Sequence, residues 1–308
     1  MWALSKWTRA VPLSILMLIA LVLPTLGQNE IIRVNTELVS VPVTVYDRQG
    51  RQLTDLRKED FRVFEDGVEQ ELAIFNASEQ PFTVFLLIDR SGSMANHRPQ
   101  LTQCVNAFAR QLRLDDSLIV ATIADDIDLL LKKTKVKDLK KSIKLRQRPK
   151  DMWSYIYDGM DDAYEMIKKV PGRKAIILFS DGAGSGTYAS LKGNLRKAEE
   201  TEAAIYTVQF DTFSQIRPYD LKSHNEMVER ANGYMRDLPK LSGGRFYQLE
   251  AIVDLDKTFS LIADELRQQY SLGYYPKIEG KKGERRQIKV KAIRTDVAVK
   301  TKTSYLIK

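Results

Sequence analysis

The sequence predicts an α/β domain with a doubly wound, mostly parallel sheet, which is inserted in a β-sandwich formed by the N- and C-terminal flanks. Two observations predict this fold class. Between residues 82 and 266, short runs that are apolar on both faces alternate with segments of helical spacing, and strands of that kind need helices on both faces. On either side of this region, apolar residues alternate with period two and helical spacing is absent.

Residues 1–27 resemble an export signal. They hold Lys6 and Arg9, no acidic residues, and an apolar run that ends in small residues. We therefore predict a cleaved signal peptide and an exported protein, in the periplasm, at the cell surface or secreted. The alternative is an uncleaved membrane anchor, because the uncharged stretch 10–29 is about long enough to span a bilayer. A single cysteine excludes an internal disulfide.

The N-terminal flank, residues 28–80, is predicted to supply the first part of the sandwich. One face of its first strand carries Val39, Val41, Val43 and Val45 at alternate positions. Further on, FRVFEDGVEQELAIF predicts two short strands joined at Asp66-Gly67, a dipeptide typical of tight hairpins.

The α/β domain is predicted for residues 81–268. Its buried strands are the runs FTVFLLID, SLIVATIA, KAIILFS and AIYTVQF. A helix between the first two has its apolar positions at helical spacing: Leu101, Cys104, Val105, Phe108 and Leu112. The segment IDLLLKKT, soon after the second strand, predicts an edge strand.

The C-terminal flank, residues 269–308, returns to alternating β-patterns in YSLGYYP, RRQIKVKAI and VAVKTKTSYLI. A domain made of residues 31–75 alone would bury little apolar area. We therefore expect the two flanks to pair in one sandwich, with the ends of the inserted domain close together.

Oxygen-bearing side chains follow two buried strands and precede one helix. Asp89 ends FTVFLLID and is followed by Ser91 and Ser93, Asp181 follows KAIILFS, and Ser154 precedes a helical pattern. In an open α/β sheet these positions converge at the carboxyl edge, where ligands bind. An oxygen-only set suits Mg²⁺, or Mn²⁺ less selectively. The competing interpretation is a turn with helix-capping hydroxyls for the first loop, and a simple N-cap for Ser154.

The three parts, DRSGS, then Ser154 ahead of YIYDG, then FSDG, resemble the metal-ion-dependent adhesion site (MIDAS) of von Willebrand factor A (VWA) domains. The flanks resemble those of a secreted bacterial subgroup of this family. The resemblance implies a metal site formed by Asp89, Ser91, Ser93, Ser154 and Asp181, with a position left for an acidic group of a partner. Ser154 stands where the family usually has threonine, so the hydroxyl is kept and a methyl group is lost.

The resemblance implies metal-ion-dependent protein binding or adhesion, with an exposed Asp or Glu of the partner completing the metal coordination, and no enzymatic activity. One alternative is a Mg²⁺-dependent hydrolase or phosphotransferase-like enzyme, but such phosphotransferases need an aspartate where this chain has Ser91. Neither His97 nor His224 lies in a nucleophile-elbow context, and no Gly-rich phosphate loop is present.

Two basic segments, residues 132–150 and 277–308, carry ten and eleven basic groups. Our default interpretation is a solvated face. Binding to an anionic surface is the alternative, and nucleic acid is not expected as a partner of an exported chain. Similarly, Asp125, Asp126 and Asp128 are expected to form an exposed turn, His97 a solvated loop residue, and Cys104 a buried thiol.

Overall fold

The structure is a computed structural model that describes residues 37–77, 80–145, 151–213 and 220–307. These residues belong to one unit, residues 36–308. The predicted signal peptide, 1–27, lies outside the described residues, and the domain limits at 28–80, 81–268 and 269–308 stay predictions. Within the described ranges, no helix is long and apolar enough to span a membrane.

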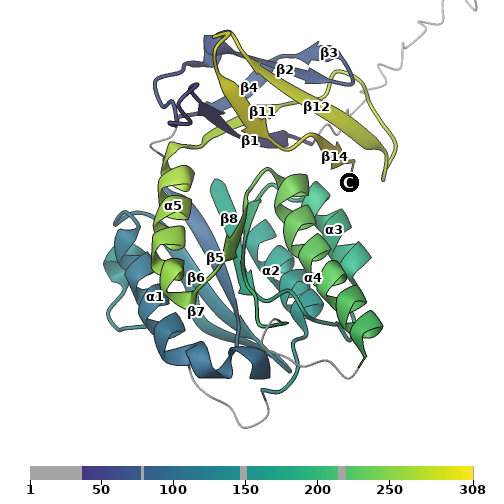
Figure 1. Ribbon diagram of the computed structural model, residues 1–308. Helices are drawn as coiled ribbons and strands as arrows, with labels where there is room; N and C mark the ends of the chain where they lie inside the picture. The colour runs from purple at the N-terminus through teal and green to yellow at the C-terminus, as the bar shows by residue number, and fades with distance from the viewer. Residues whose placement is uncertain (1–36, 78–79, 146–150, 214–219, 308) are drawn as a thin grey trace, which may run out of the picture. The chain divides into compact units, whose positions relative to one another are not determined.

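A six-stranded sheet forms the centre of the α/β domain (Figure 1). Five strands run parallel, and the sixth pairs antiparallel with its neighbour at one edge. That strand, β7, contains the segment IDLLLKKT, so the predicted edge strand is confirmed. In sheet order the strands are β10 (Phe246–Leu249), β9 (Ala204–Phe210), β8 (Arg173–Ser180), β5 (Phe82–Asp89), β6 (Ser117–Ile123) and β7 (Ile127–Lys135).

Helices cover both faces of this sheet, as predicted for a doubly wound fold. Strand β5 shows why, since all eight of its residues are buried and its successive side chains enter two different cores. Val84, Leu86 and Ile88 lie in one core, and Phe85 and Leu87 in the other. The first core lies under α1 (Arg98–Gln111) and α5 (Leu255–Gln268), and the second under α2 (Ile156–Lys168), α3 (Leu191–Glu200) and α4 (Leu221–Ser242) (Figure 1).

Two antiparallel sheets form the sandwich, and each combines strands from both flanks. The orders are β13-β1-β11-β4 and β14-β12-β2-β3, which confirms that the flanks share one sandwich. The four valines of β1 are buried in its core. The N-terminal strands are β1 (Val39–Tyr46), β2 (Phe61–Glu65), β3 (Val68–Gln70) and β4 (Leu72–Asn76), and the C-terminal ones are β11 (Tyr270–Tyr274), β12 (Arg285–Ala292), β13 (Ala298–Thr301) and β14 (Ser304–Leu306).

The predicted hairpin at Asp66-Gly67 is present, with φ of 46° and 85° at its two turn residues. However, the strand expected after it is interrupted at Glu71, and its halves β3 and β4 lie in different sheets. The last predicted strand is likewise divided, at residues 302–303, into β13 and β14. Strands that cross between the sheets of a sandwich commonly bend in this way.

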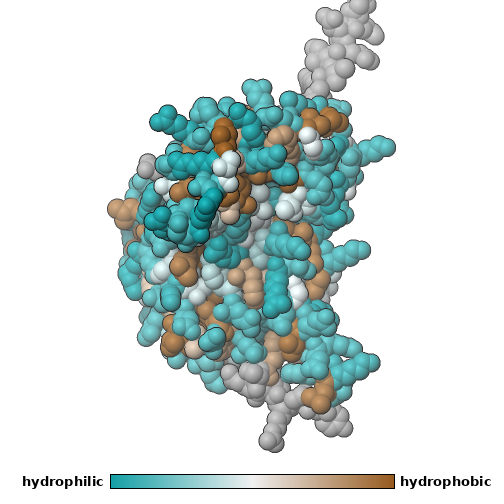
Figure 2. All heavy atoms as spheres, turned by 45° about the horizontal axis from the view of Figure 1, so that its top comes forward, coloured by the Kyte–Doolittle hydropathy of each residue, from teal (hydrophilic) through white to brown (hydrophobic). Residues whose placement is uncertain are grey.

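Ion pairs attach the sandwich to the α/β domain. Arg285 of β12 binds the buried carboxylate of Glu199, at the end of α3, through two hydrogen bonds of 2.7 and 2.9 Å. Lys300 of β13 lies 2.6 Å from the buried Glu265 of α5. The default interpretation of the C-terminal basic segment as a solvated face is therefore wrong for these residues, because they pair with buried acids of the other domain. Elsewhere, hydrophilic residues dominate the face seen in Figure 2, with hydrophobic ones scattered among them.

Candidate functional site

The three parts of the predicted site meet at the carboxyl edge of the central sheet. Strand β5 ends at Asp89, strand β8 is followed directly by Asp181, and Ser154 lies two residues before α2. The sandwich is attached at the other edge, through the C-terminal ends of α3 and α5. The topology thus leaves this edge free of the flanking sheets.

Asp89 is fully buried and accepts three hydrogen bonds. Its Oδ1 accepts from the backbone N–H of Ser91 at 2.9 Å. Its Oδ2 accepts from the hydroxyls of Ser154 at 2.9 Å and Ser180 at 2.7 Å. The N-cap of α2 is Tyr155, and Ser91 makes no side-chain capping bond. The capping interpretation of these two serines is therefore wrong.

Asp181 organises the other half of the cluster. Its Oδ2 accepts from the hydroxyls of Ser93 at 2.8 Å and Thr212 at 2.7 Å, and its Oδ1 from the N–H of Ala183. The hydroxyl oxygens of Ser91 and Ser93 lie 3.2 Å apart. Ser154 bonds to Asp89 and Ser93 to Asp181, so the five predicted side chains occupy one small region.

Two members of the cluster were missed by sequence reasoning. Ser180 is the last residue of β8, and Thr212 is the second residue after the end of β9, whereas Asp181 follows β8 directly. Applied to AIYTVQF, the strand-end rule that found Asp89 and Asp181 would have pointed to Asp211 and its neighbour Thr212.

The two carboxylates share an unfavourable environment when both are ionised. Burial and, to a smaller extent, the negative charge of Asp181 raise the pKa of Asp89 to about 6. The hydrogen bonds from Ser91 and Ser180 act in the opposite direction and lower this pKa, but they do not outweigh the two effects. A cation at this edge would relieve both effects, because it would neutralise charge that burial and repulsion now disfavour.

The donor set fits a hard divalent cation. It consists of two carboxylates and three hydroxyls, all oxygen, which is the chemistry that Mg²⁺ and Mn²⁺ accept. Among the described residues, no group of three or more His, Cys, Asp or Glu side chains is arranged to hold a metal. A site here would therefore depend on the serine hydroxyls as well as on Asp89 and Asp181.

Arg90, between Asp89 and Ser91, connects the loops around the cluster. The Arg90 side chain is 1% exposed, and its guanidinium lies 2.9 Å from the buried carboxylate of Asp151 and 2.8 Å from the exposed carboxylate of Asp126. Its carbonyl oxygen accepts from Arg98 at 2.9 Å. The acidic turn after β6, expected only to be exposed, thus contributes a structural ion pair through Asp126.

Asp158 connects the second and third parts of the site. It lies in the first turn of α2, and its carboxylate accepts hydrogen bonds from the backbone N–H groups of Thr187, Tyr188 and Ala189 and from the Thr187 hydroxyl. Burial alone would raise the pKa of Asp158. The bonds from Thr187 and Ala189 outweigh that effect and hold the pKa below its ordinary value of 3.8.

We expect Asp158→Asn to destabilise the protein by about 1–3 kcal/mol at pH 7, because hydrogen bonds to an ionised group are lost. A depressed pKa stabilises the fold above the unfolded value of 3.8, and this stability is lost as the pH falls through the folded pKa. The difference from wild type should therefore shrink in urea unfolding at pH 3. Asp256→Asn, at an exposed aspartate in the first turn of α5, is the control. An equal deficit at both pH values would contradict the prediction.

The two histidines and the single cysteine pack against other side chains. His97 is half-buried and its ring packs edge-on against Phe210, with centroids 4.9 Å apart, so it is not simply solvated. His224 packs similarly against Phe213. Cys104 is a buried free thiol, as expected.

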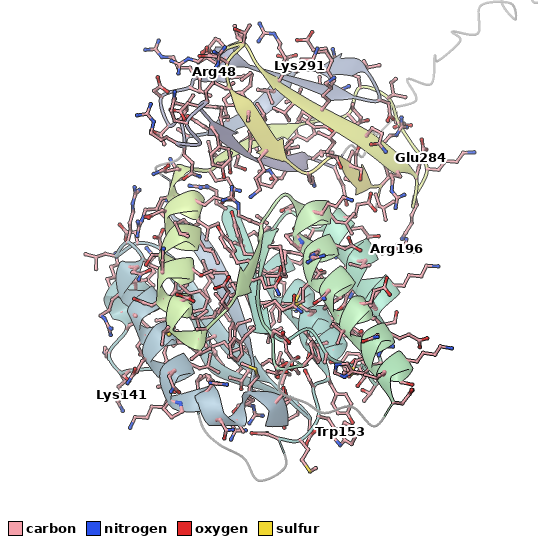
Figure 3. All side chains as sticks on the ribbon, viewed as in Figure 1. Arg48, Lys141, Trp153, Arg196, Glu284 and Lys291 are labelled. Atoms are coloured by element: carbon pink, nitrogen blue, oxygen red, sulfur yellow. The ribbon has the colours of Figure 1, made fainter. Side chains whose placement is uncertain are left out.

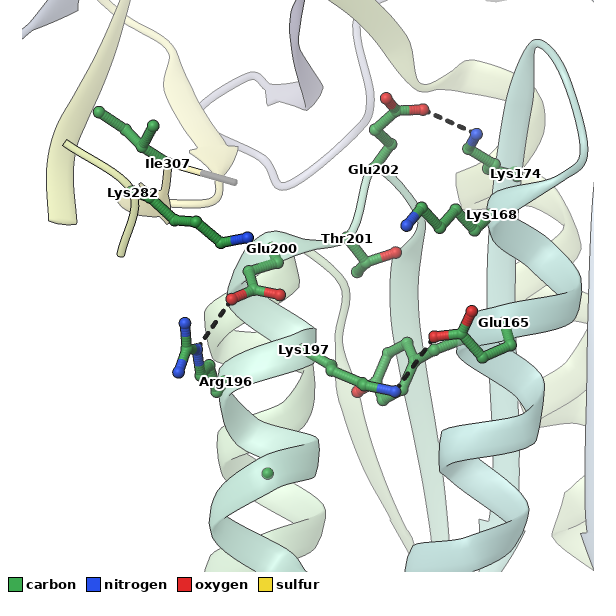
Figure 4. Close-up of a pocket in the computed structure, with 12 residues that line it drawn as sticks. Glu165, Lys168, Lys174, Arg196, Lys197, Glu200, Thr201, Glu202, Lys282 and Ile307 are labelled. Atoms are coloured by element: carbon green, nitrogen blue, oxygen red, sulfur yellow. Dashed lines mark hydrogen bonds and ion pairs between the residues drawn. The ribbon is translucent and has the colours of Figure 1, made fainter. Parts of the chain in front are cut away.

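A separate groove of about 630 Å³ lies between α2, α3 and the C-terminal end of the sandwich (Figure 4). It is rich in charge, but its basic groups are largely paired with its acids: Lys174 with Glu202, Arg196 with Glu200, and Lys197 with Glu165. None of the five predicted site residues lines it. In the basic segment 132–150, Lys135 and Lys137 pair with Asp115, and residues 146–150 lie outside the described ranges.

Comparison with known proteins finds one family match. Residues 84–183 match the model of the von Willebrand factor type A domain, a span that contains all five predicted site residues. A comparison with curated protein sequences finds no match.

Solved structures resemble the chain at low identity. VWA2, an ArnB paralog from Sulfolobus acidocaldarius, is 11% identical, with 88% of this chain and 76% of that one covered and a TM-score of 0.46. Proximal thread matrix protein 1 of the mussel byssus is 14% identical, with 66% and 51% covered and a TM-score of 0.48. The pilus adhesin SpaC of Lactobacillus rhamnosus GG is 10% identical, with 80% and 47% covered and a TM-score of 0.46. The chain thus spans about half the length of the last two.

Proposed function

Because residues 84–183 of this chain are a von Willebrand factor type A domain, we propose that the protein binds a protein partner through a divalent cation, Mg²⁺ or Mn²⁺. Asp89, Ser91, Ser93, Ser154 and Asp181 would hold the cation, directly or through water. The observation that carries the proposal is the hydrogen-bonded cluster of these oxygens at the free edge of the sheet.

The cluster suits the capture of an acidic group. Three of its five side chains are neutral hydroxyls, so they bind without cancelling positive charge. When bound, the cation would supply that remaining charge to an Asp or Glu carboxylate of the partner, a charge-assisted contact. Asp89 and Asp181 would anchor the site, and Arg90 and Asp158 would hold the surrounding loops. The proposed role is therefore binding rather than catalysis.

Export remains part of the proposal. The leader at residues 1–27 would direct the chain to the periplasm, the cell surface or the medium. An anionic surface is a weaker candidate as the partner, because Arg285, Arg286, Arg294 and Lys300 of the C-terminal basic segment are already in ion pairs.

The proposal is tested by capture on the immobilised protein. Proteins retained from a native envelope fraction in Mg²⁺ should be released by chelator, and a captured partner should lose binding when its acidic residue is changed to the amide. The carboxylate-to-amide change removes the charge with little change in shape, so a loss identifies the contact. Capture that persists in excess chelator would contradict the proposal. Turnover of phosphatase or esterase substrates in Mg²⁺ would favour the enzyme alternative.

A further inference from the structure

Two large apolar side chains are exposed directly beside the proposed cation site. Met152 and Trp153 immediately precede Ser154, and 73% and 65% of their surfaces are exposed. Their segment also contacts the first loop, because a Cβ built on Gly92 would lie 3.4 Å from the carbonyl oxygen of Met152. Figure 3 shows Trp153 at the end of the α/β domain away from the sandwich, where Arg48 and Lys291 are labelled.

This exposure does not come from a loosely held segment. On one side, Asp151 is buried and paired with Arg90 at 2.9 Å. The backbone N–H of Trp153 donates to Asp125 at 2.9 Å. On the other side, the Ser154 hydroxyl bonds to Asp89 and its carbonyl oxygen accepts from Ser185. The backbone is therefore fixed at successive residues while the two side chains point to solvent.

The fold gains little from these side chains. Burying a large apolar side chain stabilises a fold in proportion to the area removed from water, and these two side chains leave most of that area exposed. Exposed tryptophan on a fixed backbone is typical of residues that dominate binding energy at protein interfaces. Methionine next to it adds an apolar surface that adapts to different shapes.

We propose that Met152 and Trp153 form an apolar anchor that selects partners in which a large apolar side chain lies close to the metal-bound acidic residue. The inference rests on the proposed function and specifies its partner: an exposed protein segment with an Asp or Glu and a residue such as Leu nearby. Along the chain, both anchor residues lie within about 8 Å of Ser154, Cα to Cα. An extended partner advances about 3.3 Å per residue, so its apolar residue lies one to three positions from the acid.

The chain supplies its own reporter for a test. Its three tryptophans are Trp2, Trp7 and Trp153, so the full chain with Trp2→Phe and Trp7→Phe leaves Trp153 as the sole tryptophan. Three synthetic peptides are the probes: one with Asp and a Leu two positions away, one with Gly in place of that Leu, and one with Asn in place of the Asp. In Mg²⁺, the Asp–Leu peptide should bind and shift the Trp153 emission to shorter wavelength.

The variants separate the anchor from the cation site. In calorimetry on the full chain, Trp153→Ala and Met152→Ala should each weaken binding of the Asp–Leu peptide by at least about fivefold, more than most interface residues cost when truncated. Their affinity for Mg²⁺ should stay unchanged. Tyr275→Ala removes an aromatic side chain that is 54% exposed, outside the α/β domain, and should have no effect on either.

The results with the three peptides distinguish the anchor from the proposed function. Equal Mg²⁺-dependent binding of the Leu and Gly peptides would overturn the anchor and leave the proposed function standing. Failure of both acidic peptides in Mg²⁺, or equal binding of the Asn peptide, would overturn the proposed function and the anchor with it. A shift of Trp153 emission by phosphatidylglycerol vesicles, with no peptide bound, would overturn the anchor in favour of a membrane contact.

Discussion

The substitution Asp89→Asn is expected to abolish binding of Mg²⁺ and Mn²⁺ while the fold survives. The amide has nearly the same shape and its oxygen can still accept from the N–H of Ser91, but it carries no charge. Even residues that only support a metal ligand cost about 10–100-fold in affinity when changed. Loss of a ligand carboxylate should therefore exceed about 100-fold, which is measured by isothermal titration calorimetry.

A second readout distinguishes loss of the ligand from loss of the fold. Burial and the charge of Asp181 raise the pKa of Asp89, so ionised Asp89 is unfavourable without a cation. In chelator at neutral pH, Asp89→Asn should have a Tm at least as high as wild type. Asp89→Ala should be lower, because the three donors that Asp89 satisfies, on Ser91, Ser154 and Ser180, lose their acceptor.

The matched control is Ser154→Thr, which keeps the hydroxyl and adds a methyl group. It should retain Mg²⁺ binding. Wild-type affinity for Mg²⁺ in Asp89→Asn would show that the carboxylate is not a ligand, and the assignment of the cluster as a cation site would then fail.

The side chains at the strand ends were predictable because the signal for them lies in the local sequence. An apolar run that stops at a carboxylate places that carboxylate at the sheet edge, and this was enough for Asp89 and Asp181. Ser154 needed its place before a helical pattern and the family resemblance. The alternation of Val39 to Val45 fixed the buried face of β1 without any knowledge of its partner strands.

Long-range pairing was not predictable from local pattern. Arg285 and Glu199 are 86 residues apart in the chain, so a basic segment that resembles a solvated face can instead hold two domains together. The division of the hairpin segment at Glu71 has the same origin. The alternating pattern of this segment fits a single strand. The segment divides because β4 pairs in the other sheet of the sandwich, which the local pattern does not indicate.

Arg90 is the clearest case of a residue whose role depends on tertiary contacts. An arginine in a loop between Asp89 and Ser91 would ordinarily be assigned to solvent. In the structure its guanidinium is buried, and it holds the loop before α2 through Asp151 and the turn after β6 through Asp126. Arg90 thus joins three loops that border the proposed cation site.

We expect Arg90→Leu to lower the free energy of unfolding by about 3 kcal/mol, the lower end of the cost of breaking a buried ion pair, because Asp151 keeps a longer ion pair with Arg98, at 3.8 Å. The buried charge is Asp151, only 4% of whose side chain is exposed. Urea unfolding measures the change. Arg48→Leu, an exposed arginine on the sandwich (Figure 3), should stay within about 0.5 kcal/mol of wild type.

The double variant Arg90→Leu, Asp151→Asn tests the cause. If the penalty comes from the buried carboxylate that has lost Arg90, removing its charge should restore part of the lost stability, because a neutral amide is cheaper to bury. If the penalty came from lost packing of the arginine stem, the second substitution would restore nothing. The affinity for Mg²⁺ connects Arg90 with the proposed function. Arg90→Leu should weaken Mg²⁺ binding by about 10–100-fold, as expected when support behind a metal ligand is removed. Unchanged stability and unchanged Mg²⁺ affinity in this variant would show that the loops hold their positions without Arg90.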